Sequence, residues 1–233
     1  MRVNMYRIST GCTSLDSLLG GGITSGSITL IYGEAETGKT SLAIQCAVNS
    51  AKNGYKTIFI DSDRGFTPER LYQIARGFSE EASSLIVIIR PKDFLEQAEV
   101  IDNLDKCVTG RLGLVVIDTV TSLYRAALGS SESLFALNRE LNRQVATLAE
   151  LSKAYKVPIL LTSQVRESFT EEGAEVKPVA TRVLKFWSDI IIGLSRTSRR
   201  GVVSARIEKP ILPKEERTLM LLLGEYGIKD YKP

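Results

Sequence analysis

The most specific chemical pattern in this sequence is an eight-residue loop of small and polar residues that ends in a lysine and a threonine. Residues 33–40 read GEAETGKT and match G-x-x-x-x-G-K-[ST] at every fixed position. Such a loop surrounds phosphates with backbone N–H groups, its lysine reaches the β- and γ-phosphates, and its threonine hydroxyl ligates Mg²⁺. The pattern predicts a nucleoside triphosphate site with Lys39 in a catalytic role, Thr40 on the metal, and nucleotide contacts from Gly33, Glu34, Ala35, Glu36, Thr37, Gly38, Lys39 and Thr40.

A second element with a carboxylate supports this interpretation. Residues 114–118 read LVVID, an apolar strand that ends in Asp118. A hard cation takes oxygen ligands, and the carboxyl ends of strands in α/β sheets lie beside bound phosphates. Because an apolar strand followed by aspartate is also common by chance, the assignment of Asp118 as a metal residue depends on the phosphate loop upstream.

Three further polar residues follow predicted strands and are candidates for aligning or deprotonating the attacking water in hydrolysis. Asp61 and Asp63 lie at the end of one strand, and Gln164 follows another. All three would project at the sheet edge that holds Asp118, where open α/β sheets bind their ligands. Residues of these types also stabilise turns, and composition alone leaves that alternative open.

Short apolar runs alternate with helical patterns along most of the chain. This alternation predicts an α/β fold with a mainly parallel central sheet flanked by helices. After Trp187 the pattern changes to strand-like runs at 190–194, 202–207 and 219–223, which predict antiparallel strands at the sheet edge. The other predicted strands are 28–32, 57–61, 85–89, 114–118 and 158–162, and the predicted helices are 42–52, 68–78, 94–108 and 134–155.

Length and composition narrow the class of protein. The chain has 233 residues, within the range of one α/β domain, and its formal net charge of +3 does not by itself argue for nucleic acid. It contains no histidine, which excludes histidine metal sites and Ser-His or Cys-His catalysis. Three scattered cysteines, and no apolar leader or membrane span, predict a reduced, soluble, cytoplasmic protein.

Taken in order, these motifs resemble the core of the RecA/RadA recombinases, most closely their archaeal RadB branch. The segment 8–23, ISTGCTSLDSLLGGGI, is similar to the one that precedes the phosphate loop in RadA-type and KaiC-type ATPases. The segment 59–70, FIDSDRGFTPER, resembles the RadA segment with the catalytic acid, and 161–165, LTSQV, resembles the γ-phosphate sensor strand. The likeness extends from about residue 8 to residue 229 and implies a RecA-like P-loop NTPase core.

The resemblance implies that ATP and Mg²⁺ are the ligands of this site. Ser41 would join Lys39 and Thr40 in holding the phosphates and the metal, and Asp118 would support the metal. The catalytic acid of the family corresponds to Asp63.

The resemblance also gives roles to residues outside the phosphate loop. Arg70 would stack on the adenine, and Gln164 would connect the γ-phosphate to the DNA-binding loop that follows it. Lys209, in the turn at 208–210, would cover the nucleotide bound to a neighbouring copy of the chain. We also expect a homodimer or a short oligomer.

Two departures from the family pattern change the expected activity. Asp63 stands where most recombinases have glutamate, which withdraws the carboxylate by roughly 1.5 Å from a reaction that depends on positioning. We therefore expect slow hydrolysis, with a loss of about tenfold to a hundredfold. Ala35 and Glu36 replace the usual Phe-Gly pair and add a negative charge near the phosphates, which predicts modestly weaker nucleotide binding.

Only about seven residues precede the core motif, so we expect a single RecA-like ATPase core over residues 1–233, without the N-terminal helix-hairpin-helix domain or the filament linker of RadA. The resemblance then implies an ATP- and DNA-binding accessory protein of recombination that assists or regulates a RadA-type recombinase. Two alternatives stay open, a nucleotide-gated adaptor without meaningful hydrolysis and a KaiC-like signalling ATPase. The recombinase-like segment at 61–70 argues against the second.

DNA contacts would come from local features. In relatives two loops bind DNA, and they correspond to residues 122–133 and 165–182, but the second contains four glutamates and is not a basic funnel. The stretch 196–200, RTSRR, is a predicted hairpin tip whose arginines either hold phosphate or face solvent. The candidate contacts with DNA, expected to be single-stranded, are Arg166, Lys177, Arg182, Arg196, Arg199 and Arg200.

Overall fold

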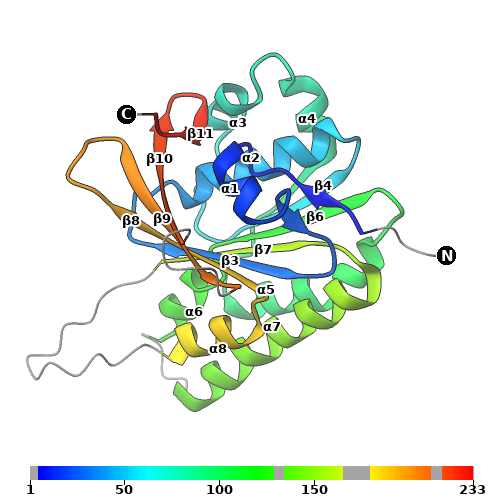
Figure 1. Ribbon diagram of the computed structural model, residues 1–233. Helices are drawn as coiled ribbons and strands as arrows, with labels where there is room; N and C mark the ends of the chain where they lie inside the picture. Colours follow the sequence, from blue (N-terminus) through cyan, green and yellow to red (C-terminus); the bar gives the residue numbers. More distant parts are fainter. Residues whose placement is uncertain (1–4, 129–133, 165–178, 211–216, 233) are drawn as a thin grey trace, which may run out of the picture.

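A nine-stranded sheet forms the centre of the computed structural model, which describes residues 5–128, 134–164, 179–210 and 217–232 (Figure 1). The strand order is β11-β10-β9-β8-β3-β7-β6-β4-β5. The strands from β8 to β5 are parallel, and β9, β10 and β11 extend one edge in antiparallel fashion. Their bounds are β3 Ile28–Gly33, β4 Lys56–Asp61, β5 Ile86–Ile89, β6 Leu112–Asp118, β7 Ile159–Gln164, β8 Ile190–Arg196, β9 Val202–Lys209, β10 Thr218–Gly224 and β11 Gly227–Asp230.

Helices cover both faces of this sheet (Figure 1). The central strands are buried on both sides, so successive residues enter different cores, and in β4 Phe59 lies in one core while Ile58 and Ile60 lie in the other. The first core packs under α1 Thr13–Leu18, α2 Lys39–Lys52, α3 Pro68–Ala75 and α4 Ser79–Leu85. The second packs under α5 Phe94–Asp102, the 3₁₀ turn η1 Leu104–Cys107, α6 Ser122–Ala127, α7 Leu134–Tyr155 and α8 Val179–Trp187.

The two ends of the described chain meet on α2. Strands β1 Arg7–Ile8 and β2 Ile23–Thr24 form a small antiparallel sheet around α1. The Gln45 amide of α2 donates to the carbonyl oxygens of Thr10, at 2.8 Å, and Ile228, at 2.9 Å, and accepts from the Ile228 N–H at 2.8 Å. One buried side chain therefore fastens both the entry segment and the β10–β11 hairpin to the helix that follows the phosphate loop.

The predicted fold class is confirmed, and the main differences concern short helices. The predicted helix at 68–78 is wrong beyond Ala75, because Arg76 adopts a left-handed conformation with φ of 45° and α4 begins anew at Ser79. The helix at 94–108 is divided into α5 and η1. Helices α6 and α8 were not predicted, and they occupy parts of the segments that the resemblance assigned to DNA-binding loops.

The C-terminal strands also differ from the prediction in one respect. The first of them, β8, runs parallel to β3, with Gly33 opposite Leu194, so the antiparallel extension begins only at β9. A fourth strand, β11, was not predicted; it completes a hairpin with β10. The parallel pairing of β8 brings the end of this strand beside the phosphate loop.

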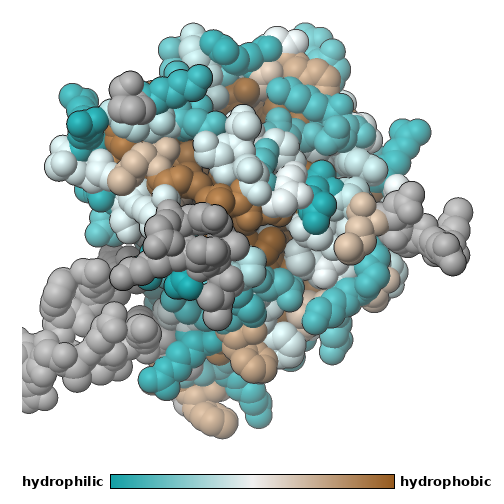
Figure 2. All heavy atoms as spheres, viewed as in Figure 1, coloured by the Kyte–Doolittle hydropathy of each residue, from teal (hydrophilic) through white to brown (hydrophobic). Residues whose placement is uncertain are grey.

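The surface seen in Figure 2 is hydrophilic over most of the helices, with a band of hydrophobic residues across the middle of this face. No helix within the described ranges is long and apolar enough to cross a membrane. Cys12 and Cys46 are buried, Cys107 is exposed, and all three are free.

Candidate nucleotide site

The phosphate loop connects β3 to α2, and two glycines permit its course. A Cβ at Gly33 would lie 2.2 Å from the carbonyl oxygen of Leu194 on the adjacent strand. Gly38 caps α2 with φ of 88°, and a Cβ there would lie 2.4 Å from Cδ2 of Leu223. Since only glycine tolerates both this conformation and this proximity, the two positions fix the loop tightly against β8 and β10.

Hydrogen bonds within the loop hold it in place. The Thr37 hydroxyl donates to the carbonyl oxygen of Glu34 at 2.9 Å, and Nζ of Lys39 donates to the same oxygen at 2.6 Å. Lys39 is only 6% exposed, and burial lowers its pKa, while the carboxylates of Asp118 and Asp63 oppose that shift. A poorly hydrated ammonium group at a helix N-terminus favours an anionic ligand, as the sequence pattern predicts.

Asp118 lies at the end of β6 and is completely buried. The Thr162 hydroxyl donates to its Oδ1, while Oδ2 has no hydrogen-bond partner in the described structure. Burial raises the pKa of Asp118, and the hydrogen bond from Thr162 opposes that shift. An unpartnered carboxylate oxygen beside a threonine hydroxyl is a donor set that fits Mg²⁺.

The rest of such a cation's coordination shell would come from outside the protein. Within the described ranges no group of three or more His, Cys, Asp or Glu side chains forms a metal site. Mg²⁺ commonly keeps several waters and binds through one or two carboxylates together with substrate phosphates. The pair of Thr40 and Asp118 therefore fits a metal that arrives with a nucleotide.

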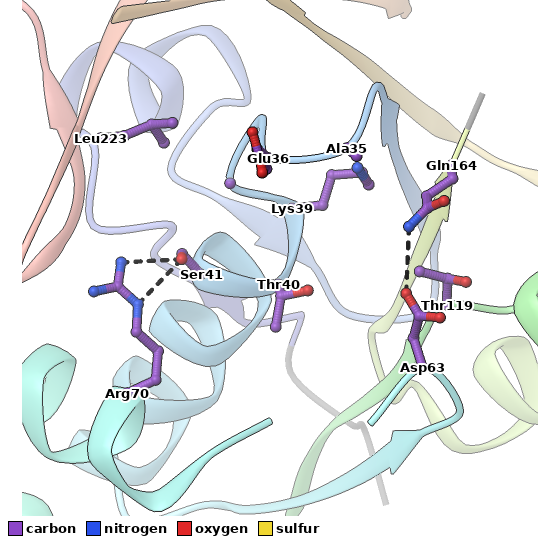
Figure 3. Close-up of a pocket in the computed structure, with 11 residues that line it drawn as sticks. Ala35, Glu36, Lys39, Thr40, Ser41, Asp63, Arg70, Thr119, Gln164 and Leu223 are labelled. Atoms are coloured by element: carbon purple, nitrogen blue, oxygen red, sulfur yellow. Dashed lines mark hydrogen bonds between the residues drawn. The ribbon is translucent and has the colours of Figure 1, made fainter. Parts of the chain in front are cut away.

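A cavity of about 320 Å³ opens beside the loop, toward Asp63 and Gln164 (Figure 3). Nε2 of Gln164 donates to Oδ2 of Asp63 at 3.3 Å, so the structure brings together the two residues predicted to align water. Oε1 of Gln164 accepts from Arg125 of α6 at 3.2 Å, a contact that the sequence did not predict. The cavity is lined by Ala35, Glu36, Gly38, Lys39, Thr40, Ser41, Asp63, Arg70, Thr119, Gln164 and Leu223.

Asp61 has the turn-stabilising role that the sequence left open. Its side chain is completely buried; Oδ1 accepts from the N–H groups of Gly65, at 2.9 Å, and Phe66, at 3.4 Å. Oδ2 pairs with Nε of Arg90 at 3.0 Å. All of these bonds hold the turn after β4, whereas Asp63, two residues later, is exposed to the cavity.

Arg70 connects the cavity to the C-terminal hairpin. Its Nε and Nη2 donate to the Ser41 hydroxyl at 3.2 and 3.0 Å (Figure 3), and its Nη1 and Nη2 also donate to the carbonyl oxygens of Glu225, at 2.7 Å, and Gly224, at 3.2 Å. Arg70 therefore lies at the cavity, as expected, but in contact with the hairpin. Stacking on adenine stays a prediction.

Arg196 lies against the phosphate loop. Its Nη2 donates to the carbonyl oxygen of Ala35 at 2.9 Å and to the Glu36 carboxylate at 3.2 Å. Nε lies 3.5 Å from the carboxylate of Glu34. The sequence assigned Arg196 to DNA contact, and the structure adds a role that depends on the parallel pairing of β3 with β8.

The remaining predicted residues lie away from the cavity. Lys209 pairs with Ile191 at the start of β8, at the opposite end of the strand from the phosphate loop, and Nζ donates to the carbonyl oxygen of Ser188 at 2.5 Å. It therefore does not contact a nucleotide held by its own chain. Contact with a nucleotide on another copy stays a prediction.

The candidate DNA contacts are dispersed. Arg182 is exposed on α8, and Arg199 and Arg200 are exposed at the tip between β8 and β9. Arg199 lies over the ring of Tyr231, with 5.8 Å from its Cζ to the ring centroid, and donates to the tyrosine hydroxyl. Arg166 and Lys177 lie outside the described residues.

The sequence motifs did not indicate two of the cavity residues, Thr119 and Leu223. Thr119 directly follows Asp118, so its position after a functional strand was a usable signal. Leu223 comes from β10, and nothing in its local sequence indicates that it contacts Gly38.

Comparisons with known proteins agree with this architecture. The Rad51 family model matches residues 1–231. A protein of Thermococcus kodakarensis named DNA repair and recombination protein RadB is 37% identical over 96% of this chain and 99% of that protein. The protein of the same name from Methanosphaera stadtmanae is 36% identical over 79% of both. The structure described as the crystal structure of the RadB recombinase has a TM-score of 0.80 and 34% identity over 97% of this chain and all of that one. The chain therefore belongs to the Rad51/RecA family, in its RadB branch.

Proposed function

We propose that this protein acts in DNA repair and homologous recombination as an ATP- and DNA-binding accessory protein with weak ATPase activity. Its relatives are named as DNA repair and recombination proteins, and membership of the Rad51/RecA family supports the same process. We further propose that it assists or regulates a RadA-type recombinase.

The observation that carries this proposal is the convergence of four strand ends on one cavity. The phosphate loop follows β3, Asp63 follows β4, Gln164 ends β7, and β6 ends in Asp118, whose neighbour Thr119 lines the cavity. Parallel pairing of these strands places their carboxyl ends at one edge, where such sheets bind ligands. This arrangement supports phosphoryl transfer to water, a reaction whose catalysis is mostly positioning and charge stabilisation.

Each residue has a definite part in this reaction. Lys39 and the loop N–H groups would hold the triphosphate, and Asp63 and Gln164 would orient the attacking water. Thr40 and Asp118 would hold Mg²⁺, which neutralises charge that develops on the phosphates. Turnover is slow because the aspartate at position 63 reaches less far than the glutamate of most relatives.

ATP turnover with and without single-stranded DNA tests the proposal, with Asp63→Glu and Lys39→Ala as variants. We expect low turnover in the wild type, a rise of about tenfold in Asp63→Glu, and none in Lys39→Ala. If all three proteins stay at background while the wild type binds ATP, the hydrolysis proposal fails. The protein would then act as an adaptor switched by nucleotide binding alone.

We also propose that Lys209 contacts nucleotide on a second copy of the chain. Its position at the far end of β9 from its own phosphate loop supports contact between copies and excludes contact within one chain. Turnover per molecule should then rise with protein concentration in the wild type but not in Lys209→Ala. Equal concentration dependence in both proteins would contradict this role.

A further inference from the structure

Two completely buried glutamines lie in the layer of helices α5 and α7. Gln97 of α5 and Gln144 of α7 are both 0% exposed, on helices whose other buried residues are apolar apart from Ser152. A buried amide in apolar surroundings is tolerated only when its N–H and C=O groups are hydrogen-bonded. The partners of these two amides therefore indicate what they do.

Gln97 contacts both the turn that carries Asp63 and the loop that follows Asp118. Its Oε1 accepts from the Ser62 hydroxyl at 2.7 Å, and Ser62 directly precedes Asp63. Its Nε2 donates to the carbonyl oxygen of Val120 at 3.4 Å, two residues after Asp118. A single side-chain amide thus bridges the turn after β4 and the loop after β6.

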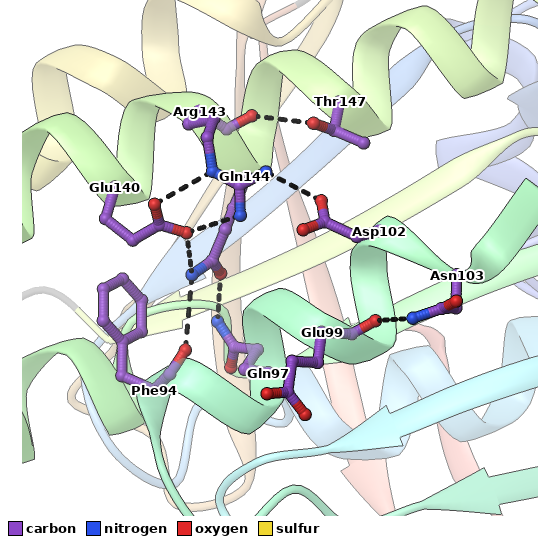
Figure 4. Close-up of polar contacts among 9 residues, drawn as sticks. All are labelled: Phe94, Gln97, Glu99, Asp102, Asn103, Glu140, Arg143, Gln144 and Thr147. Atoms are coloured by element: carbon purple, nitrogen blue, oxygen red, sulfur yellow. Dashed lines mark hydrogen bonds and ion pairs between the residues drawn. The ribbon is translucent and has the colours of Figure 1, made fainter.

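Gln144 and a group of ion pairs fix Gln97 from the other side (Figure 4). Nε2 of Gln97 donates to Oε1 of Gln144 at 2.9 Å, and Nε2 of Gln144 donates to Glu140 at 3.3 Å and to the Phe94 carbonyl oxygen at 3.4 Å. Arg143 pairs with Glu140 at 2.7 Å and with Asp102 at 2.8 Å. The orientation of Gln97 is therefore set by two helices at once.

Other contacts also hold the turn that carries Asp63, among them the bond from Nε2 of Gln164 to Oδ2 of Asp63. The N–H groups of Ser62 and Asp63 donate to the Asp118 carbonyl oxygen at 2.8 and 3.1 Å, and Asp61 and Arg90 hold the distal part of the turn. The Ser62 hydroxyl adds the bond that ties the turn to the helical layer. Since a displacement of about 1 Å can lower a rate a hundredfold, this bond lies where it affects positioning.

We propose that Gln97 is a positioning residue for ATP hydrolysis that sets the placement of Asp63 relative to Asp118, with Gln144 as its outer support. This inference rests on the proposed ATPase function and adds residues that do not touch the cavity. Gln97 changes no charge and transfers no proton; it acts only through Ser62 and the Val120 carbonyl group.

Four variants test it: Gln97→Leu, Ser62→Ala, Gln144→Leu and the double variant Gln97→Leu/Gln144→Leu. We expect the turnover number of Gln97→Leu and Ser62→Ala to fall about tenfold to a hundredfold, with the dissociation constant for a fluorescent ATP analogue within about twofold of the wild type. Ser152→Ala is the matched control, because its buried hydroxyl donates to the Val157 carbonyl oxygen at 2.8 Å, far from both loops. Its turnover number should not change.

The double variant separates positioning from stability. It replaces both members of the Gln97–Gln144 hydrogen bond, so no Gln144 amide oxygen is left buried without a partner, and its melting temperature should exceed that of Gln97→Leu while turnover stays low. Wild-type turnover in a folded double variant would overturn the proposal.

Hydrogen exchange gives a readout that does not depend on hydrolysis. With a non-hydrolysable ATP analogue bound, backbone amides at 62–66 should exchange faster in Gln97→Leu than in the wild type and in Ser152→Ala. If the wild type turns over no faster than Lys39→Ala, the ATPase proposal fails, and exchange still decides whether Gln97 holds the turn. Unchanged exchange at 62–66 would overturn the positioning role.

Discussion

Arg196 donates from Nη2 to the carboxylate of Glu36 at 3.2 Å, so a cation at the end of β8 lies against an anion of the phosphate loop. The sequence indicated only that Glu36 adds negative charge near the phosphates. With Arg196 beside it, and also 3.5 Å from Glu34, part of that charge is neutralised within the same chain. We therefore expect nucleotide affinity to depend on a balance between residues that are 160 positions apart.

Removing the charge of Glu36 and removing the charge of Arg196 should shift ATP affinity in opposite directions. Glu36→Gln should tighten binding of a fluorescent ATP analogue, and Arg196→Gln should weaken it, each by about twofold to fivefold because both groups are largely exposed. Titrations at about 0.05 M and about 0.5 M salt should show the differences shrinking at high salt. Lys52→Gln, which removes a distant exposed cation, is the control, and an effect equal to that of Arg196→Gln would contradict a local interaction.

Alanine at Gly38 should be far more harmful than alanine at Gly54. Both glycines have positive φ, 88° and 76°, but a Cβ at Gly54 has nothing within 4 Å, whereas one at Gly38 would meet Leu223 at 2.4 Å. Gly54→Ala reports the conformational strain alone, about 1 kcal/mol in urea unfolding. Gly38→Ala should lose at least about 1 kcal/mol more together with ATP binding, and Leu223→Ala should restore part of the stability. Equal losses of unfolding free energy in Gly38→Ala and Gly54→Ala would argue against close packing of Gly38 on Leu223.

Mutation of Asp61 should mainly lower stability, whereas mutation of Asp63 should mainly lower ATP turnover. Asp61→Ala leaves the N–H groups of Gly65 and Phe66 without their partner and removes the charge that pairs with Arg90, for a loss of about 2–4 kcal/mol of unfolding free energy. Asp63→Ala, at an exposed position, should change stability by less than about 0.5 kcal/mol while abolishing turnover. Chemical denaturation and ATPase assays on both variants check this, and comparable destabilisation by both would contradict it.

Lys39 should lower the stability of the nucleotide-free protein. Burial lowers the pKa of the Lys39 ammonium group below 10.5. At pH values between this lowered pKa and 10.5, the lysine therefore holds its proton in the unfolded chain more than in the folded protein. Stability therefore rises with pH through this window, and the unfavourable contribution is fully present at neutral pH. Lys39→Met should raise the free energy of unfolding at pH 7 by about 0.5–2 kcal/mol and abolish ATP binding, with the gain shrinking in alkaline solution. A pH-independent gain would exclude this cause.

Arg199 and Arg200 should contribute to DNA affinity through phosphate contacts alone. The double change to glutamine should weaken binding of single-stranded DNA and reduce the slope of log affinity against log salt by about 1–2. Lys52 and Lys153, exposed at the ends of α2 and α7, provide a control pair of equal charge. If both pairs change the slope equally, the hairpin is not a preferred contact.

The core of the candidate site was predictable because its residues lie at strand ends. Asp63, Asp118 and Gln164 each follow an apolar run, and parallel pairing brings the ends of such runs to one edge of a sheet. The phosphate loop required no long-range information, since its spacing alone encodes a local conformation.

The rest of the site depends on pairing between distant segments. Leu223 reaches Gly38, and Arg196 reaches Glu36, only because β8 adds to β3 and the hairpin strands follow it. Periodicity predicts that a strand exists but not which strand lies beside it. The short helix α4, SEEASSL, has only Ala82 buried, so it lacked the apolar stripe by which longer helices are recognised.

Gly38 packs against Leu223 and Ile228, which are synthesised almost 200 residues later in the chain. The phosphate loop leaves the ribosome long before β10 and β11, so a nascent chain carries the loop without the wall that closes the cavity around it. We therefore expect nucleotide to stabilise the chain only after β10 and β11 have been made.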